Sequence, residues 1–175
     1  MLGCKRRRWD GSAAGCYGGA VPEIDPYRLL FVCTGNICRS PMAAALARAY
    51  ATKRGWAVEV ASAGVLDLKG RPAEPNAIRV MEEIGIDLRT HQARGVNEEL
   101  VRWADYILAM ELAHCTELRR RYPEIEDRVL LLGSFGGSLE IADPMGGWRW
   151  RFRRTRDEIR HCVEGFLDQL PTRPG

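Results

Sequence analysis

The chain has 175 residues, which is enough for one domain with a sizeable core and short for two. Hydrophobic residues make up 46% and charged residues 28%, as in average globular proteins, and no apolar run approaches the roughly 20 residues of a membrane span. The formal net charge of +3 is mild and gives no argument for a nucleic-acid partner. We therefore expect one soluble domain that binds neither membrane nor nucleic acid.

Residues 1–27 differ in composition from the rest of the chain. They combine a basic cluster, Lys5 to Arg8, with many Gly and Ala residues and show no hydrophobic periodicity. Such a composition is typical of segments without a packed core. We predict a flexible N-terminal extension over 1–27, a folded domain over 28–170 and a short tail over 171–175.

The domain begins with a strand, a loop and a helix. The apolar run from Leu29 to Val32 predicts a buried parallel strand over Arg28–Cys33. Pro41 is favoured at the first position of a helix, and apolar residues follow it at helical spacing up to Tyr50. The segment Thr34–Ser40 is therefore a loop between a strand and a helix.

Later segments continue to alternate between strand and helix patterns. Further strands are predicted over 57–61, 106–110 and 129–132, and helices over 75–84 and 159–170. Alternation of this kind gives a parallel sheet with helices on both faces. The sequence thus predicts a single α/β domain with about four parallel strands.

The loop from Cys33 to Arg39 combines groups suited to phosphoryl transfer. Cys33 supplies a nucleophilic sulfur, the helix N-terminus supplies free backbone N–H groups, and Arg39 supplies a planar cation for phosphate oxygens. The helix dipole also favours the thiolate form of a cysteine placed there. Gly35 and Asn36 tolerate the positive φ that a tight loop demands. This loop is the candidate anion site.

A second segment, Cys115–Arg121, has the same spacing of cysteine and arginine. It lacks glycine and lies in an apparently helical stretch, where backbone N–H groups are already used. We therefore interpret Cys115 as structural. Spacing alone does not identify the site.

The six cysteines show no pattern of a disulfide scaffold or a zinc site, and no secretory signal is seen. We expect a reducing, cytoplasmic location, no metal and no cofactor.

His114 and His161 are interpreted as surface residues. Asp143, which precedes Pro144, is open to two interpretations, a turn former or a general acid.

The segment Val32–Pro41, VCTGNICRSP, resembles the signature of the low-molecular-weight protein tyrosine phosphatase family. The likeness extends over about residues 28–170 and includes Ser62–Gly64, Gly85–Leu88 with His91, and Ala142–Pro144. It implies a flavodoxin-like strand order with a phosphate-binding loop after the first strand. It also implies an enzyme that acts on phosphorylated proteins, and we expect this enzyme to be a monomer.

The resemblance assigns roles to individual residues. Cys33 corresponds to the nucleophile, Arg39 to the phosphate-binding arginine and Asp143 to the general acid. The substrate-binding residues it implies are Thr34, Gly35, Asn36, Ile37, Cys38 and Ser40. Ser62 and His91 complete a polar network with Asn36 and Ser40, and Ser40 donates to the thiolate. Cys38 is either a core residue or a partner that traps oxidised Cys33 as a disulfide.

The sequence leaves alternatives for the substrate. Met145-Gly146-Gly147 stands where tyrosine phosphatases often have an aromatic residue, and it resembles the bacterial protein arginine phosphatase branch. Those arginine phosphatases carry threonine at the position of Ile37, so we favour phosphotyrosine.

Two other classes remain alternatives. An arsenate reductase would need a resolving cysteine pair, and Cys115 and Cys162 are 47 residues apart. A non-catalytic phosphoprotein-binding module is the other.

The alternating Trp and Arg residues over 148–153, with arginines continuing to Arg160, are either a solvated helix start or a surface that attracts an acidic phosphoprotein.

Overall fold

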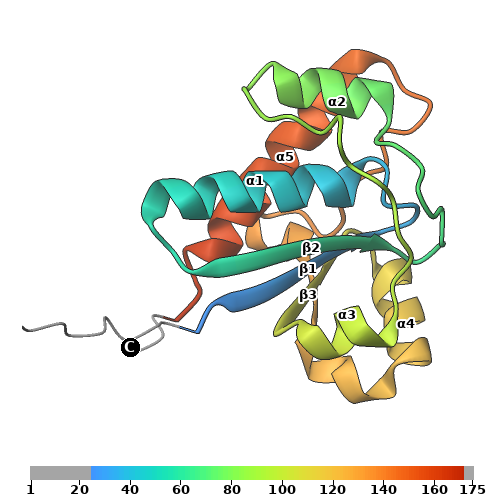
Figure 1. The fold of residues 1–175 in the computed structure, drawn as a ribbon, viewed down its shortest axis with the longest axis vertical. Coiled ribbons are helices and arrows are strands. Elements are labelled where there is room, and N and C mark those ends of the chain that lie inside the picture. The colour runs from blue at the N-terminus through green and yellow to red at the C-terminus, as the bar shows by residue number, and fades with distance from the viewer. Residues whose placement is uncertain (1–24, 172–175) are drawn as a thin grey trace, which may run out of the picture.

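The computed structural model describes residues 25–171 (Figure 1). The predicted N-terminal extension therefore lies almost wholly outside the described residues, and so does the tail. None of the helices within residues 25–171 is long and apolar enough to cross a membrane.

The sheet has four parallel strands, as predicted. They are β1 (Tyr27–Cys33), β2 (Val58–Gly64), β3 (Tyr106–Ala109) and β4 (Val129–Leu131), in the order β2-β1-β3-β4. This is the predicted flavodoxin-like order. Because β1 lies between β2 and β3, the connections on its two sides diverge at its carboxyl end, where α/β proteins bind ligands.

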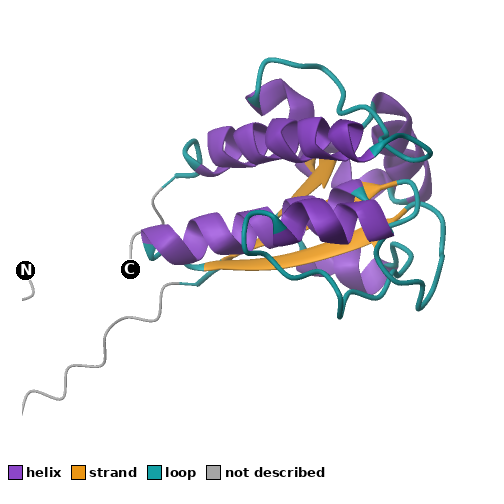
Figure 2. Cartoon of the chain, turned by 90° about the horizontal axis from the view of Figure 1, so that it is seen from above, coloured by secondary structure: helices purple, strands orange, loops and turns teal. Residues whose placement is uncertain are grey.

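Helices cover both faces of the sheet, which confirms the predicted fold class. Figure 1 shows α1 (Arg39–Arg54), α2 (Pro75–Glu82) and α5 (Arg149–Leu167) on one side and α3 (Glu98–Trp103) and α4 (Leu112–Arg121) on the other. Figure 2, seen from above, shows long helices lying over the sheet and running roughly along its long strand. Two short 3₁₀ helices, Pro123–Arg128 and Leu132–Phe135, flank β4.

Alternate residues of β1 build two separate cores. Leu29 and Phe31 pack with the residues of α1, α2 and α5, whereas Leu30 and Val32 pack with those of α3 and α4. Successive side chains of a strand point to opposite faces, so a strand buried on both faces is apolar throughout. The continuous apolar run was therefore a sound basis for predicting β1.

The last helix begins earlier than the apolar stripe that predicted it. α5 begins at Arg149, ten residues before the predicted 159, which agrees with the interpretation of the segment 148–153 as a helix start. Thr155 and Arg156 occupy buried positions of this helix, and the Arg156 guanidinium donates to the Val80 carbonyl at 2.7 Å. These polar residues on the core face interrupted the apolar period that the prediction relied on. Smaller differences of a few residues occur at the ends of the other elements.

Candidate active site

The loop Thr34–Cys38 joins the carboxyl end of β1 to the start of α1. Cys33 is the last residue of the strand, and Arg39 is the first residue of the helix. The N-terminus of α1 has no side-chain cap and no acidic residue in its first turn. Within the described chain, the N–H groups of Gly35, Asn36 and Ile37 donate to no other backbone group. Such a turn has the free donors and the dipole that bind an anion.

The backbone of the loop agrees with one expectation and corrects another. Asn36 has a φ of 55°, the left-handed conformation that asparagine tolerates. Gly35 does not have a positive φ, contrary to the expectation. Space is limited there instead, because a Cβ atom would lie 2.7 Å from Leu68 Cδ1 and the end of that side chain would have to move.

A polar network holds the loop through Asn36, which is fully buried. Its Nδ2 donates to Ser40 Oγ at 2.8 Å and to Ser62 Oγ at 2.9 Å. The backbone carbonyl oxygen of Asn36 is 2.7 Å from His91 Nε2. Burial lowers the pKa of His91, which favours the neutral ring. Ser40 Oγ is in turn 3.1 Å from Cys33 Sγ. The structure thus brings together the four residues expected to support the loop.

Arg39 lies at the centre of the site with only 1% of its surface exposed. Its Nη1 donates to Glu111 and, at 2.9 Å, to the carbonyl of Ile141. Its Nη2 donates to Asp143 Oδ2 at 2.7 Å and to Thr34 Oγ1 at 3.3 Å. Its Nε is buried without a hydrogen-bond partner among residues 25–171. The Arg39 guanidinium therefore connects the loop to Glu111, which follows β3, and to the segment that contains Ile141 and Asp143.

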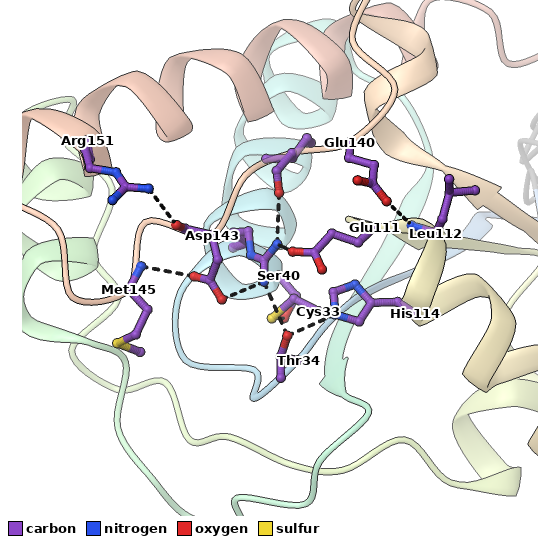
Figure 3. A network of polar contacts seen from close by, with 12 residues as sticks. Cys33, Thr34, Ser40, Glu111, Leu112, His114, Glu140, Asp143, Met145 and Arg151 are labelled. Carbon is purple, nitrogen blue, oxygen red and sulfur yellow. Dashed lines mark hydrogen bonds and ion pairs between the residues drawn. The ribbon is translucent and has the colours of Figure 1, made fainter.

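Sequence analysis missed Glu111 and was wrong about His114. His114 is 4% exposed, and its Nε2 is 3.0 Å from Thr34 Oγ1 (Figure 3). Burial lowers its pKa, although the nearby Glu111 acts in the opposite direction. Both residues follow β3, the neighbour of β1, so their carboxyl-end position was a usable indication. His161 is exposed, as predicted.

Cys33 lines a cavity of about 210 Å³. Its loop wall is made by Thr34, Gly35, Ile37, Cys38 and Arg39, and its far side by Leu66, Leu68, Arg71, Asp143 and Met145. Another cavity lies far from this chemistry, at the amino end of β1, and is lined by residues such as Tyr27, Trp56 and Leu170. The cavity at Cys33 is the one that combines a thiol, cations and a carboxylate.

The segment after Asp143 forms a tight turn beneath α5. Asp143 Oδ1 accepts from the Met145 N–H at 3.1 Å, and Arg151 Nη2 donates to the Asp143 carbonyl at 3.3 Å. Gly146 has a φ of 73°, and a Cβ atom at Gly147 would lie 2.7 Å from Arg151 Cδ. The conformation of the turn thus favours glycine at both Gly146 and Gly147.

Four cysteines lie in the described chain, and all are free. Burial raises the pKa of Cys38, Cys115 and Cys162, which keeps these three thiols protonated. Among residues 25–171 there is no group of three or more His, Cys, Asp or Glu residues that could hold a metal ion. Cys4 and Cys16 lie outside the described residues.

Comparisons with known proteins agree with this geometry. A family described as low molecular weight phosphotyrosine protein phosphatase matches residues 28–173. A protein-arginine-phosphatase of Geobacillus stearothermophilus is 41% identical over 149 residues, which cover 84% of this chain and 98% of the relative. The low molecular weight protein-tyrosine-phosphatase Etp of Escherichia coli is 38% identical over 141 residues, covering 81% and 87%.

Solved structures give the same result. The low molecular weight protein tyrosine phosphatase from T. tengcongensis superposes with a TM-score of 0.79 at 36% identity, covering 82% of this chain and 99% of that one. The YwlE arginine phosphatase from Geobacillus stearothermophilus gives 0.76 at 40% identity, covering 82% and 92%.

Proposed function

This chain belongs to the low-molecular-weight phosphotyrosine protein phosphatase family of hydrolases, and from that premise we propose that it hydrolyses phosphotyrosine in proteins through a cysteinyl-phosphate intermediate. The nucleophile is Cys33, the phosphate-binding cation is Arg39, and the general acid and base is Asp143. One observation carries the proposal: the thiol, the guanidinium and the carboxylate line one cavity at an uncapped helix N-terminus.

The first step forms the Sγ–P bond and breaks the bond between phosphorus and the ester oxygen. Ser40 donates a hydrogen bond to the Cys33 thiolate, and the loop N–H groups bind the non-bridging oxygens as charge develops on them. Asp143 gives its proton to the leaving tyrosine oxygen. In the second step water attacks phosphorus, Asp143 accepts a proton from that water, and the Sγ–P bond breaks to release phosphate.

The contacts of Arg39 suggest how the site changes when substrate enters. Nη1 is held by Glu111 and the Ile141 carbonyl, so the guanidinium keeps its position. Nη2 contacts the Asp143 carboxylate, which a phosphoryl group would replace as the anionic partner. The side chain of Asp143 is 41% exposed and can exchange protons with solvent once released. Glu111 is a positioning residue in this scheme.

The walls of the cavity favour an aryl ester. Ile37, Leu66, Leu68 and Met145 present apolar surface for a phenyl ring. Arg71 adds a cation to the same lining and would repel the guanidinium of phosphoarginine.

Arginine phosphatase activity is the second candidate, and a specific observation favours it. Asp143-Pro144 is followed here by Met-Gly-Gly, which resembles the arginine phosphatase branch, and one relative with that name is 41% identical. Relatives named tyrosine phosphatases reach similar identity, so identity alone does not separate the substrates.

The remaining alternatives have less support. Cys115 and Cys162 belong to cores on opposite faces of the sheet, which separates the cysteines that an arsenate reductase would pair. A binding module without turnover would not need Asp143 beside Arg39.

We place the enzyme in the cytoplasm, because oxidation of Cys33 would remove the nucleophile. The Cys33–Cys38 disulfide stays a prediction.

The substrate is tested by measuring kcat/KM for phosphotyrosine and phosphoarginine peptides on wild type, Ile37→Thr and Ile37→Val. Valine has the shape of threonine without the hydroxyl, so the pair isolates hydrogen bonding from size. We expect wild type and Ile37→Val to prefer phosphotyrosine, and Ile37→Thr to shift the ratio toward phosphoarginine by about 5-fold to 150-fold. A wild type that prefers phosphoarginine would overturn the assignment.

A further inference from the structure

Large apolar side chains are exposed where α5 begins. Trp148 is 80% exposed and Trp150 is 58% exposed, and Met145 at the rim of the cavity is 46% exposed. Exposed aromatic residues that cluster near a cavity are a common feature of protein interaction surfaces. These side chains add little to the core.

The same turn of helix carries positive charge without acidic partners. Arg149, Arg151 and Arg154 are exposed and form no ion pair with any residue in 25–171. By contrast, the neighbouring Arg153 and Arg156 both pair with Glu83. The first turn of α5 has no acidic residue, and cations there oppose the helix dipole. Arg151 donates to the Asp143 carbonyl, but residues 25–171 supply no carboxylate partner for any of these three arginines.

This surface, which we call the Trp/Arg surface, consists of Trp148, Arg149, Trp150, Arg151 and Arg154. Trp150 and Arg154 are four residues apart and lie one above the other on the helix, opposite its buried Phe152 and Ile159. Arg151 contacts the lining of the catalytic cavity, since it donates to the carbonyl of Asp143, which lines that cavity (Figure 3). Met145, which lines the cavity, lies three residues before Trp148, so the Trp/Arg surface adjoins the rim of the cavity.

We infer that the Trp/Arg surface binds an acidic segment of the substrate next to its phosphorylated residue. This inference rests on the proposed phosphatase function and specifies the class of substrate. Arginine forks pair with carboxylates, and the indole faces contact the backbone and apolar side chains of the same segment. Complementary charge also raises the rate of association with acidic partners.

The test compares peptides with one phosphorylated core, flanked on both sides by either glutamates or glutamines. The phosphorylated residue is whichever one the wild type turns over faster. At low salt we expect kcat/KM to be about 10-fold higher for the acidic peptide and to converge with the neutral peptide as salt rises. In Arg149→Glu/Arg154→Glu this preference should disappear, while para-nitrophenyl phosphate is hydrolysed as in wild type. Trp150→Ala should raise KM for both peptides.

A charge-matched control is Lys53→Glu/Arg102→Glu, which changes net charge equally. Lys53 lies in the last turn of α1, about 20 Å along the helix from Arg39, and Arg102 lies on α3. The control should keep the preference for acidic peptides.

Three outcomes overturn the inference. They are equal losses in both double variants, no preference in wild type, and an effect of the arginine variant on RNA binding alone. If para-nitrophenyl phosphate is not hydrolysed, or is still hydrolysed by Cys33→Ser, the proposed function fails instead.

Discussion

Two segments of this chain place an arginine six residues after a cysteine, and they fold differently. Cys33 and Arg39 lie on either side of a loop between β1 and α1, whereas Cys115 and Arg121 both lie inside α4. Both cysteines are free and 3% exposed, so burial does not distinguish them. The difference is the break in secondary structure, which leaves backbone N–H groups free at one segment and not at the other.

The environments of the two cysteine and arginine pairs follow from that break in secondary structure. Cys33 borders a cavity, while Cys115 packs in the core with Leu118 and Ile125. Arg39 is 1% exposed and bonds to two carboxylates, whereas Arg121 is 32% exposed and pairs with Glu117 on its own helix. A cysteine and arginine at this spacing become an anion site only where the chain passes from strand to helix. Each prediction below tests this contrast.

The largest expected effect is loss of activity in Cys33→Ser. Phosphate release from para-nitrophenyl phosphate should fall by at least about 10⁴-fold, because the serine hydroxyl is a far weaker nucleophile at this position. Cys115→Ser should keep activity within about 2-fold, although it places a hydroxyl in an apolar core. Circular dichroism checks that both variants fold. Substantial loss in Cys115→Ser with an intact fold would contradict the contrast.

The next effect concerns the carboxylate beside each arginine. In Asp143→Asn, kcat for a phosphotyrosine peptide should fall by about 10²-fold to 10⁴-fold, because the leaving oxygen is no longer protonated. An ester with a low-pKa leaving group should be affected much less. Glu117→Gln, which alters the corresponding partner of Arg121, should leave both rates unchanged. Equal losses for both leaving groups in Asp143→Asn would remove Asp143 from the acid role.

A smaller effect is expected in the relative reactivity of the thiols. Iodoacetate should label Cys33 at least about 10-fold faster than Cys115, since burial raises the pKa of Cys115 and the cavity gives access to Cys33. Inorganic phosphate should slow labelling of Cys33 alone. Peptide mass spectrometry assigns each rate to its residue, including Cys4 and Cys16. Faster labelling of Cys115, without protection by phosphate, would reverse the contrast.

How much the sequence predicts depends on how local the determinants are. β1, the loop and the start of α1 are consecutive, so an apolar run, Gly-Asn and Ser-Pro were enough to predict them. The network around Asn36 was placed through family resemblance, because Ser62 and His91 lie 26 and 55 residues away. Glu111 was not identified, because its position after β3 indicates only that it lies at the carboxyl edge of the sheet and does not indicate the contact with Arg39, 72 residues away.

The early turns of α5 show a second limit. Arg156 is buried because its guanidinium reaches the Val80 carbonyl and Glu83, so a charged residue occupies a core position. Hydrophobic periodicity cannot represent such a residue. His114 is a similar case, because its ring is buried and contacts Thr34 of the loop.

His114 also connects the two segments, because it precedes Cys115 on α4 and its ring contacts Thr34 in the loop. Its pKa is lowered from the ordinary 6.5 chiefly by burial, so the folded protein holds the neutral ring. Below pH 6.5 the unfolded chain takes up a proton that folded His114 does not, and the free energy of unfolding should decrease until the pH reaches the lowered value.

His114→Gln should therefore reduce the loss of stability between about pH 7.5 and pH 5.5, measured by urea unfolding. Part of the slope should remain, because burial also lowers the pKa of His91, which contacts Asn36. His161→Gln, at an exposed position of α5, is the matched control and should keep the wild-type slope. A variant at His114 with the wild-type slope would mean that the ring is solvated. In that case His114 would not couple α4, the helix of Cys115, to the loop of Cys33 through its protonation.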